Sequence, residues 1–191
     1  MSEEQVIGDS IPADCELIQI RTTELRQLFN PIDPSPLPER DLESKAEDFI
    51  VSWARASRSD ARFALQIRVE RQDASDKPSM AGEAIREYFR QKSLSAHRRL
   101  QHLFRVGRTS LLIGVLSLAV AVVLAQVVER LLSEIAVGVV IRESVIIGGW
   151  VAMWRPLEIF LYDWWPIRAE RQLYDRLSTM PVRITYLNPA G

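Results

Sequence analysis

The sequence has few of the residues from which metal centres and covalent cross-links are built. Its 191 residues include one cysteine, Cys15, and two histidines, His97 and His102. A single cysteine excludes an internal disulfide. The two histidines are five residues apart on an expected helix, whereas side chains that meet on a helix face are three or four apart. We therefore predict neither a metal site nor a cofactor.

The short motifs of common catalytic and nucleotide-binding sites are also missing. The chain contains no G-x-x-x-x-G-K-[ST], G-x-G-x-x-G, C-x-x-C, G-x-S-x-G or H-E-x-x-H sequence. Its carboxylates are scattered over expected helices whose other face is apolar, which is typical of solvated positions. We predict that the protein is not an enzyme and has no catalytic residues.

Charge is absent from one long stretch of the chain. The twenty residues from Thr109 to Val128 carry no ionisable side chain. As a helix they would extend about 30 Å, the thickness of the hydrocarbon core of a bilayer. A second apolar stretch runs from Val145 to Trp165. Two spans with a short connection predict a transmembrane hairpin.

The position of the second span depends on four charged residues. A window from Ile135 to Trp154 would put Arg142 and Glu143 at the bilayer centre, and one from Ser144 to Trp165 would put Arg155 and Glu158 deep. A central arginine costs roughly 2.5–3.5 kcal/mol. We therefore expect Arg142 and Glu143 at the outer interface and Arg155 and Glu158 towards the inner one, where Trp164 and Trp165 would form an aromatic belt.

Basic residues predict the orientation. Residues 86–108 carry seven Lys or Arg against the single acid Glu87, and four arginines follow the second apolar stretch. A basic block suggests nucleic acid, but one that adjoins a membrane span is what the positive-inside rule expects. We predict that both termini are cytoplasmic, in the inner membrane of a bacterium, and that nucleic acid is not a partner.

The remaining segments predict a small α+β domain. Residues 15–22 and 61–71 have the composition and alternation of strands, and Phe63, Leu65, Ile67 and Val69 form the face expected to be buried. Asp41 is the expected N-cap of a helix from Leu42 to Ala56, whose apolar face includes Phe49 and Trp53. Strand, helix and strand in this order predict a β-α-β unit, which the C-terminal strand 181–187 would complete.

The predicted fold is therefore an α+β membrane protein, a cytoplasmic β-α-β domain on a two-helix hairpin. A single helix is expected from about 80 to 129, with Gly107 as its only expected bend, and Pro166 is expected to interrupt the chain after the second span. The predicted divisions are a flexible tail (1–12), the domain (13–79), a basic juxtamembrane helix (80–108), the first span (109–128), an external connection (129–142), the second span (143–165), and a cytoplasmic helix and strand (166–191).

Three groups of residues are candidate sites. Arg155 and Glu158 are three apart on one helix face; ionisable residues at membrane depth are functional candidates, but an ion pair that fixes the depth of the span is the favoured interpretation. Small residues at four-residue spacing allow helices to pack closely, either within the hairpin or between copies. They are Ser117, Ala121, Ala125, Gly148 and Ala152.

The third group lies in a loop. Residues 30–40 contain four prolines and, with the next residue, present Asp33, Ser35 and Asp41. A stiff loop with carboxylates and a hydroxyl could bind a ligand. The favoured interpretation is that Asp33 and Asp41 cap local turns and the following helix.

Three segments resemble a known family. Residues 28–54 (LFNPIDPSPLPERDLESKAEDFIVSWA), 105–114 (RVGRTSLLIG) and 149–171 (GWVAMWRPLEIFLYDWWPIRAER) are similar to segments of uncharacterised bacterial two-span membrane proteins. The resemblance implies a location in the bacterial cytoplasmic membrane. It implies no activity, ligand or catalytic residue.

These observations lead to three functional hypotheses. The first is a non-enzymatic, membrane-anchored interaction or accessory protein that binds other proteins. The second is a homo-oligomeric channel or transporter-like assembly in which Arg155 and Glu158 line a polar path. The third is a membrane-tethered enzyme that uses Asp33, Ser35 or Asp41.

Overall fold

A computed structural model describes residues 5–58, 60–73, 76–132 and 136–187. The chain forms two compact units. The first contains the residues up to Ser95 together with those from Glu170 onwards, and the second runs from Ala96 to Ala169. The first unit is therefore assembled from both ends of the sequence.

The first unit contains a four-stranded sheet with the order β1-β4-β3-β2. Its strands are β1 (Gln5–Gly8), β2 (Cys15–Thr22), β3 (Arg62–Val69) and β4 (Val182–Tyr186). β2 pairs with β3 and β3 with β4 in parallel, whereas β1 is antiparallel to β4. The predicted α+β class, the parallel β-α-β unit and the addition of the C-terminal strand are confirmed.

The predicted flexible tail over residues 1–12 is wrong for Gln5–Gly8, which form the edge strand β1. Asp9 holds this strand, because its Oδ2 accepts hydrogen bonds from Val182 N at 3.1 Å and from Arg86 Nη1 at 2.8 Å. Gly8 has a φ of +112°, and a Cβ there would lie 2.4 Å from Val182 O. The partner strand is more than 170 residues away in sequence, so no local pattern indicates the pairing.

Helix α1 (Ser44–Ala56) begins later than expected, and its cap is not Asp41. Glu43 caps the helix, since its Oε2 accepts from Lys45 N at 2.7 Å and Ala46 N at 3.2 Å. Its buried residues are Ile50, Val51 and Ala54. The expected apolar face is therefore divided: Phe49 and Trp53 are 44% and 40% exposed.

The core of the first unit lies between the sheet and three helical segments. Phe63, Leu65, Ile67 and Val69 of β3 are all buried, as their alternation predicted. Buried side chains from α1, from the start of α2 (Pro78–Leu132) and from α4 (Trp164–Ser178) complete the core. They include Ile50, Ala81, Ala84, Ile85, Phe89, Leu173, Tyr174 and Leu177.

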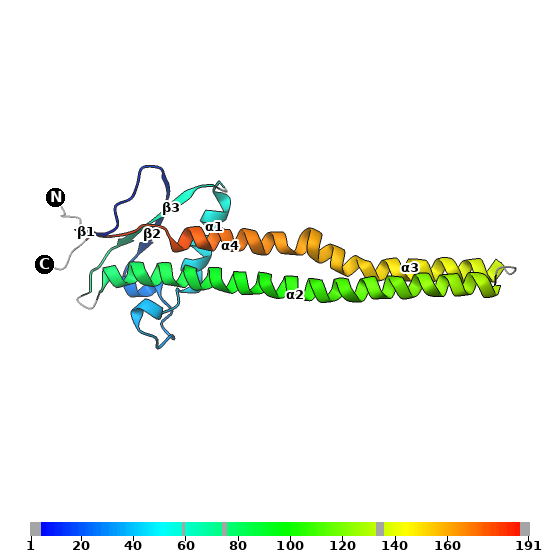
Figure 1. Cartoon of the computed structure of the whole chain (residues 1–191). Helices are drawn as coiled ribbons and strands as arrows, with labels where there is room; N and C mark the ends of the chain where they lie inside the picture. The colour runs from blue at the N-terminus through cyan, green and yellow to red at the C-terminus, as the bar shows by residue number, and fades with distance from the viewer. Residues whose placement is uncertain (1–4, 59, 74–75, 133–135, 188–191) are drawn as a thin grey trace. The chain divides into compact units, whose positions relative to one another are not determined.

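The second unit is a helical hairpin, in which α2 and α3 (Ala136–Glu158) lie side by side (Figure 1). α2 confirms the single long helix, and it continues unbroken through Gly107. The predicted connection over 129–142 is largely helical, because α2 ends at Leu132 and α3 begins at Ala136. Glu129 and Arg130 continue α2 beyond the uncharged stretch, and the apolar residues 136–141 form the start of α3.

The predicted interruption at Pro166 is wrong, because the helix continues through this residue. A π-helical segment, η3 (Ile159–Asp163), joins α3 directly to α4, and Pro166 lies in the first turn of α4. Proline has no N–H to donate to the carbonyl four residues earlier, and a wider π turn is one way for a helix to absorb such a defect. The helix predicted to end near 165 and the one predicted from 167 are therefore continuous.

Candidate functional site

The main candidate feature is the apolar surface of the second unit. The helical segments Pro78–Leu131 and Val137–Ser178 each contain an 18-residue window apolar enough to cross a membrane, with mean hydropathy 2.7 and 1.5. Only 17% and 11% of these windows are buried inside the structure. A core helix of a water-soluble protein is mostly buried. The apolar windows of these two helices are instead mostly exposed.

Contacts along the hairpin define how α2 and α3 are aligned. A Cβ on Gly149 would lie 2.8 Å from Ala121 Cβ, and one on Gly114 would lie 3.0 Å from Met153 Sδ. Near the turn, Arg142 Nε lies 3.5 Å from Glu129 Oε2. The two helices are antiparallel, so residues later in α2 lie opposite residues earlier in α3, at similar spacing. Arg155 therefore lies close to the level of Gly114, within the uncharged stretch.

The small residues have two different roles in this hairpin. Ala121 and Ala125 are buried. Gly149 makes the close contact with α2, whereas a Cβ on Gly148 would meet nothing within 4 Å. Sequence reasoning selected Gly148 and missed Gly149 and Gly114. Gly114 could have been found from its spacing to Ser117, Ala121 and Ala125, because this spacing places all four residues on one face of a helix.

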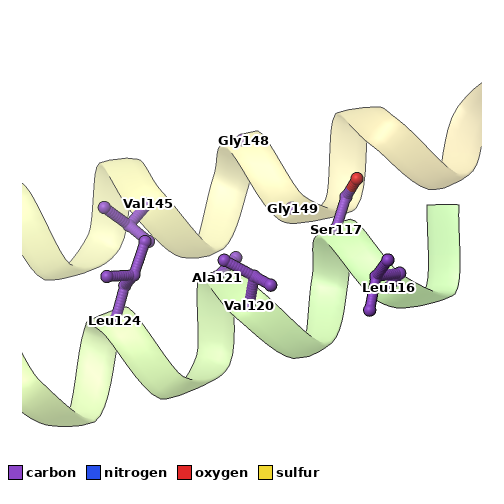
Figure 2. Close-up of a pocket in the computed structure, with 8 residues that line it drawn as sticks. All are labelled: Leu116, Ser117, Val120, Ala121, Leu124, Val145, Gly148 and Gly149. Atoms are coloured by element: carbon purple, nitrogen blue, oxygen red, sulfur yellow. The ribbon is translucent and has the colours of Figure 1, made fainter. Parts of the chain in front are cut away.

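An apolar groove of about 420 Å³ lies along this contact (Figure 2). Ser117 and Gly148, both predicted helix-packing residues, line it from opposite helices. The other lining residues are Leu116, Val120, Ala121, Leu124, Val145 and Gly149. Ala152, the last predicted packing residue, is half-buried on α3 and has its carbonyl oxygen 3.1 Å from the position of a Cβ on Gly114.

Arg155 and Glu158 form the predicted pair, and a third residue joins them. Arg155 Nη1 lies 2.9 Å from Glu158 Oε2 and 3.5 Å from Asp163 Oδ2. Sequence reasoning missed Asp163, because eight residues along a regular α-helix leave two side chains about 80° apart. The π turns of η3 rotate the chain less per residue and reduce this offset. One arginine thus serves two carboxylates.

The expected interfacial charges also form a three-residue group. Arg142 contacts Glu143 Oε1 at 3.1 Å on its own helix and Glu129 Oε2 at 3.5 Å across the hairpin. Glu129, the first residue of the expected connection, lies on α2. The pairing links the two helices at the end of the uncharged stretch.

The proline-rich loop uses its carboxylate internally. Asp33 accepts hydrogen bonds from Ser35 N and Asp41 N, both at 2.9 Å. These bonds, first from Asp41 and then from Ser35, lower the pKa of Asp33 below its ordinary value. Arg40 closes the loop by donating from Nε and Nη2 to Ser35 O at 3.2 and 3.1 Å. Asp33 therefore caps the turn through its carboxylate, whereas Asp41 takes part through its backbone N–H.

An open groove of about 710 Å³ lies beside this loop. Its charged lining residues are Glu39, Glu83, Arg86, Glu87 and Arg90. Arg90 is paired with Glu87 at 2.7 Å and Arg86 with Asp9 at 2.8 Å, so both arginines are already neutralised. Charges paired in this way stabilise the fold and leave no cation directed at a ligand.

Comparisons of the chain with protein-family models, with curated proteins and with solved structures find no match. Within the described ranges, no group of three or more His, Cys, Asp or Glu side chains could hold a metal ion.

Proposed function

We propose that the protein is an integral membrane protein whose α2–α3 hairpin spans the bilayer and whose α+β domain binds other proteins, as a scaffold or accessory subunit without catalytic activity. The observation that carries this proposal is the exposure of the hairpin's apolar side chains. A helix with apolar residues on every side is stable in lipid but unfavourable in water.

The charged residues at both ends of the hairpin support this assignment. On α2, Arg108 and Glu129 bracket a stretch that extends about 30 Å. On the return path, Arg142 and Asp163 are a similar distance apart along the chain. Arg155 lies inside this layer, and its pairing with Asp163 directs its charge towards the nearer boundary.

The strand pairing in the first unit supports an even number of membrane crossings by the chain. β3 precedes the hairpin and β4 follows it, yet they are neighbours in one sheet. Both flanks of the hairpin must therefore lie on the same side of the membrane. The arginines that flank the apolar stretches favour the cytoplasmic side. The resemblance to bacterial two-span proteins leads us to propose the bacterial cytoplasmic membrane.

Exposed aromatic residues support a binding role for the domain. Phe49 and Trp53 are four residues apart on α1, so they are neighbours on the helix surface, and both are substantially exposed. Exposed aromatic pairs of this kind are enriched at protein interfaces. We propose that they contact a protein partner.

Native mass spectrometry of the protein extracted gently from its own membrane tests the proposal. A stoichiometric foreign subunit, lost in the variant F49A/W53A but retained in E16A on β2, is the expected result. A protein that does not float with liposomes would refute the membrane assignment. A membrane-bound monomer without any partner would refute the interaction role.

A homo-oligomeric channel or transporter-like assembly is the second candidate, favoured by the exposure of Arg155. This side chain is 61% exposed although it lies within the apolar layer of the hairpin. Charged groups at such depth normally face a protein interior or a water-filled cavity. Neighbouring copies could supply that cavity, since two helices per chain cannot enclose a pore. Arg155→Ala and Glu158→Ala would then abolish ion flux in liposomes without reducing expression.

A further inference from the structure

One end of the hairpin is rich in arginine, and Asp163, the carboxylate next to it on the return path, is already paired with Arg155. Residues 96–108 and 164–169 contain Arg98, Arg99, Arg105, Arg108 and Arg168, and neither range contains Asp or Glu. The opposite end mixes both signs, and Arg142 there is paired with two carboxylates. In the part of the chain that the structure describes, Arg105, Arg108 and Arg168 form no ion pair with a carboxylate.

Aromatic side chains lie at the same end of the hairpin. The ring centroids of Phe104 on α2 and Phe160 in η3 are 6.3 Å apart, those of Phe104 and Trp164 are 6.5 Å apart, and those of Trp164 and Trp165 are 5.1 Å apart. Trp165 is 64% exposed. Tryptophan is enriched where hydrocarbon meets headgroups, because its ring is apolar and its N–H is polar.

The arginines lie at the level of these rings. Arg105 follows Phe104 directly, and Arg108 is three residues further on, about 4.5 Å along the helix axis. Arg168 is one helical turn beyond Trp164, but its guanidinium carbon lies 5.5 Å from the centroid of that ring. Stacking on the ring therefore places the guanidinium group of Arg168 at the level of Trp164. Headgroups occupy about 5–7 Å on each side of the hydrocarbon core, which is enough to include all three arginines.

We propose that Arg105, Arg108 and Arg168, with Trp164 and Trp165, form a binding surface for the headgroups of anionic phospholipids. Guanidinium groups match phosphate oxygens with paired hydrogen bonds, and the neighbouring carboxylate of Asp163 is paired with Arg155 rather than with these arginines. A net negative headgroup is favoured over a zwitterionic one by the unpaired positive charge. This inference rests on the proposed insertion of the hairpin into a bilayer.

The test uses the full chain in nanodiscs that contain equal amounts of phosphatidylglycerol and phosphatidylcholine with identical acyl chains. Native mass spectrometry counts the lipids that remain bound after gentle release. We expect phosphatidylglycerol to exceed its bulk share, and the preference to fall roughly fivefold for each arginine replaced by glutamine. Arg130→Gln, at the opposite end of the hairpin, is the matched control and should keep the preference.

A triple variant R105K/R108K/R168K separates charge from folding. It retains the three positive charges, so it should retain most of the preference that R105Q/R108Q/R168Q loses. Equal retention of the two lipids by the unmodified chain would overturn the inference, as would a preference that survives in the triple glutamine variant or disappears in Arg130→Gln. Failure of the chain to enter nanodiscs or float with liposomes would instead refute the membrane assignment.

Discussion

At the scale of single residues, Gly148 and Gly149 are adjacent in sequence but have opposite surroundings. Gly149 faces α2, where a Cβ would lie 2.8 Å from Ala121 Cβ and 3.1 Å from Leu118 Cδ1. Gly148 faces the open groove, where a Cβ would meet nothing within 4 Å. The first glycine permits the helices to approach, and the second leaves a surface available to lipid or to another helix.

Substitution of these glycines by alanine should therefore have opposite effects. Gly149→Ala should destabilise the hairpin by about 1–3 kcal/mol, because the methyl group overlaps Ala121 on the facing helix. Gly148→Ala should be neutral or slightly stabilising, since alanine is the better helix former. Reversible unfolding in mixed micelles measures both. Equal effects would contradict the assigned contacts.

A larger residue at Gly148 distinguishes the two roles of the groove. Gly148→Leu should leave the hairpin folded, because the space outside this residue is open. If a second copy occupies the groove, the same variant should dissociate the oligomer in native mass spectrometry. An oligomer that persists would show that the contact between copies lies elsewhere.

Asp33 should make the stability of its loop depend on pH. Its pKa in the folded protein is lowered, mainly by hydrogen bonds from Asp41 N and Ser35 N. The loop therefore gains its full stabilisation above the unfolded pKa of about 3.9, and loses it as the pH falls through the lower folded value. Hydrogen exchange of the Ser35 and Asp41 amides should accelerate in that range. Asp33→Asn should remove this dependence.

At the scale of elements, the side chain of Asp9 reinforces the backbone pairing that joins β1 to the sheet. Asp9 accepts from Val182 N in β4 and from Arg86 in α2. β1 has only four residues and lies at the edge of the sheet, so it has few other contacts to retain it.

Asp9→Ala should weaken the docking of β1 by about 1 kcal/mol, roughly a fivefold increase in local opening. Hydrogen exchange of the β1 amides, compared with those of β3, provides the measurement. Asp14→Ala is the control, because the ion pair between Asp14 and Arg62 at 3.1 Å is largely exposed and should contribute little. An unchanged exchange rate in β1 would show that Asp9 does not hold the strand.

Elements with a strong local pattern could be predicted from the sequence, and the others could not. The alternation of Phe63, Leu65, Ile67 and Val69 predicts a strand whose face with these four residues is buried, although Ala64 on the other face is buried as well. β1 has no such pattern and forms only because β4 is present. The exposure of Phe49 and Trp53 depends on which face of α1 packs on the sheet, a choice that helical spacing alone does not specify.

The same distinction applies to the candidate sites. Arg155 and Glu158 could be predicted as a pair because they are three residues apart in a helix. Asp163 could not, since its contact with Arg155 requires the π turns of η3. The residues of the proposed lipid surface come from both helices, and only the alignment of the hairpin brings Phe104 to Trp164.

At the scale of the whole molecule, the shared sheet predicts the sidedness of the chain. In a background with Cys15→Ser, single substitutions Ser52→Cys, Arg130→Cys and Thr179→Cys place one thiol before, within and after the hairpin. An impermeant maleimide added to intact spheroplasts should label only Arg130→Cys. Ser52→Cys and Thr179→Cys should react together, after permeabilisation. Different reactivity of these two would be incompatible with a hairpin that crosses the membrane twice.

The strand order of the sheet also determines the order in which the protein can be made. β1 is synthesised first, yet the strand it pairs with in the described sheet is β4, which leaves the ribosome after both apolar helices. β2 and β3 can pair earlier, but one side of β3 stays uncovered until β4 arrives. Completion of the domain must therefore follow synthesis of the hairpin. A nascent chain stalled within α3 would present an unfinished sheet, a state in which chaperones and proteases can distinguish an incomplete molecule from a finished one.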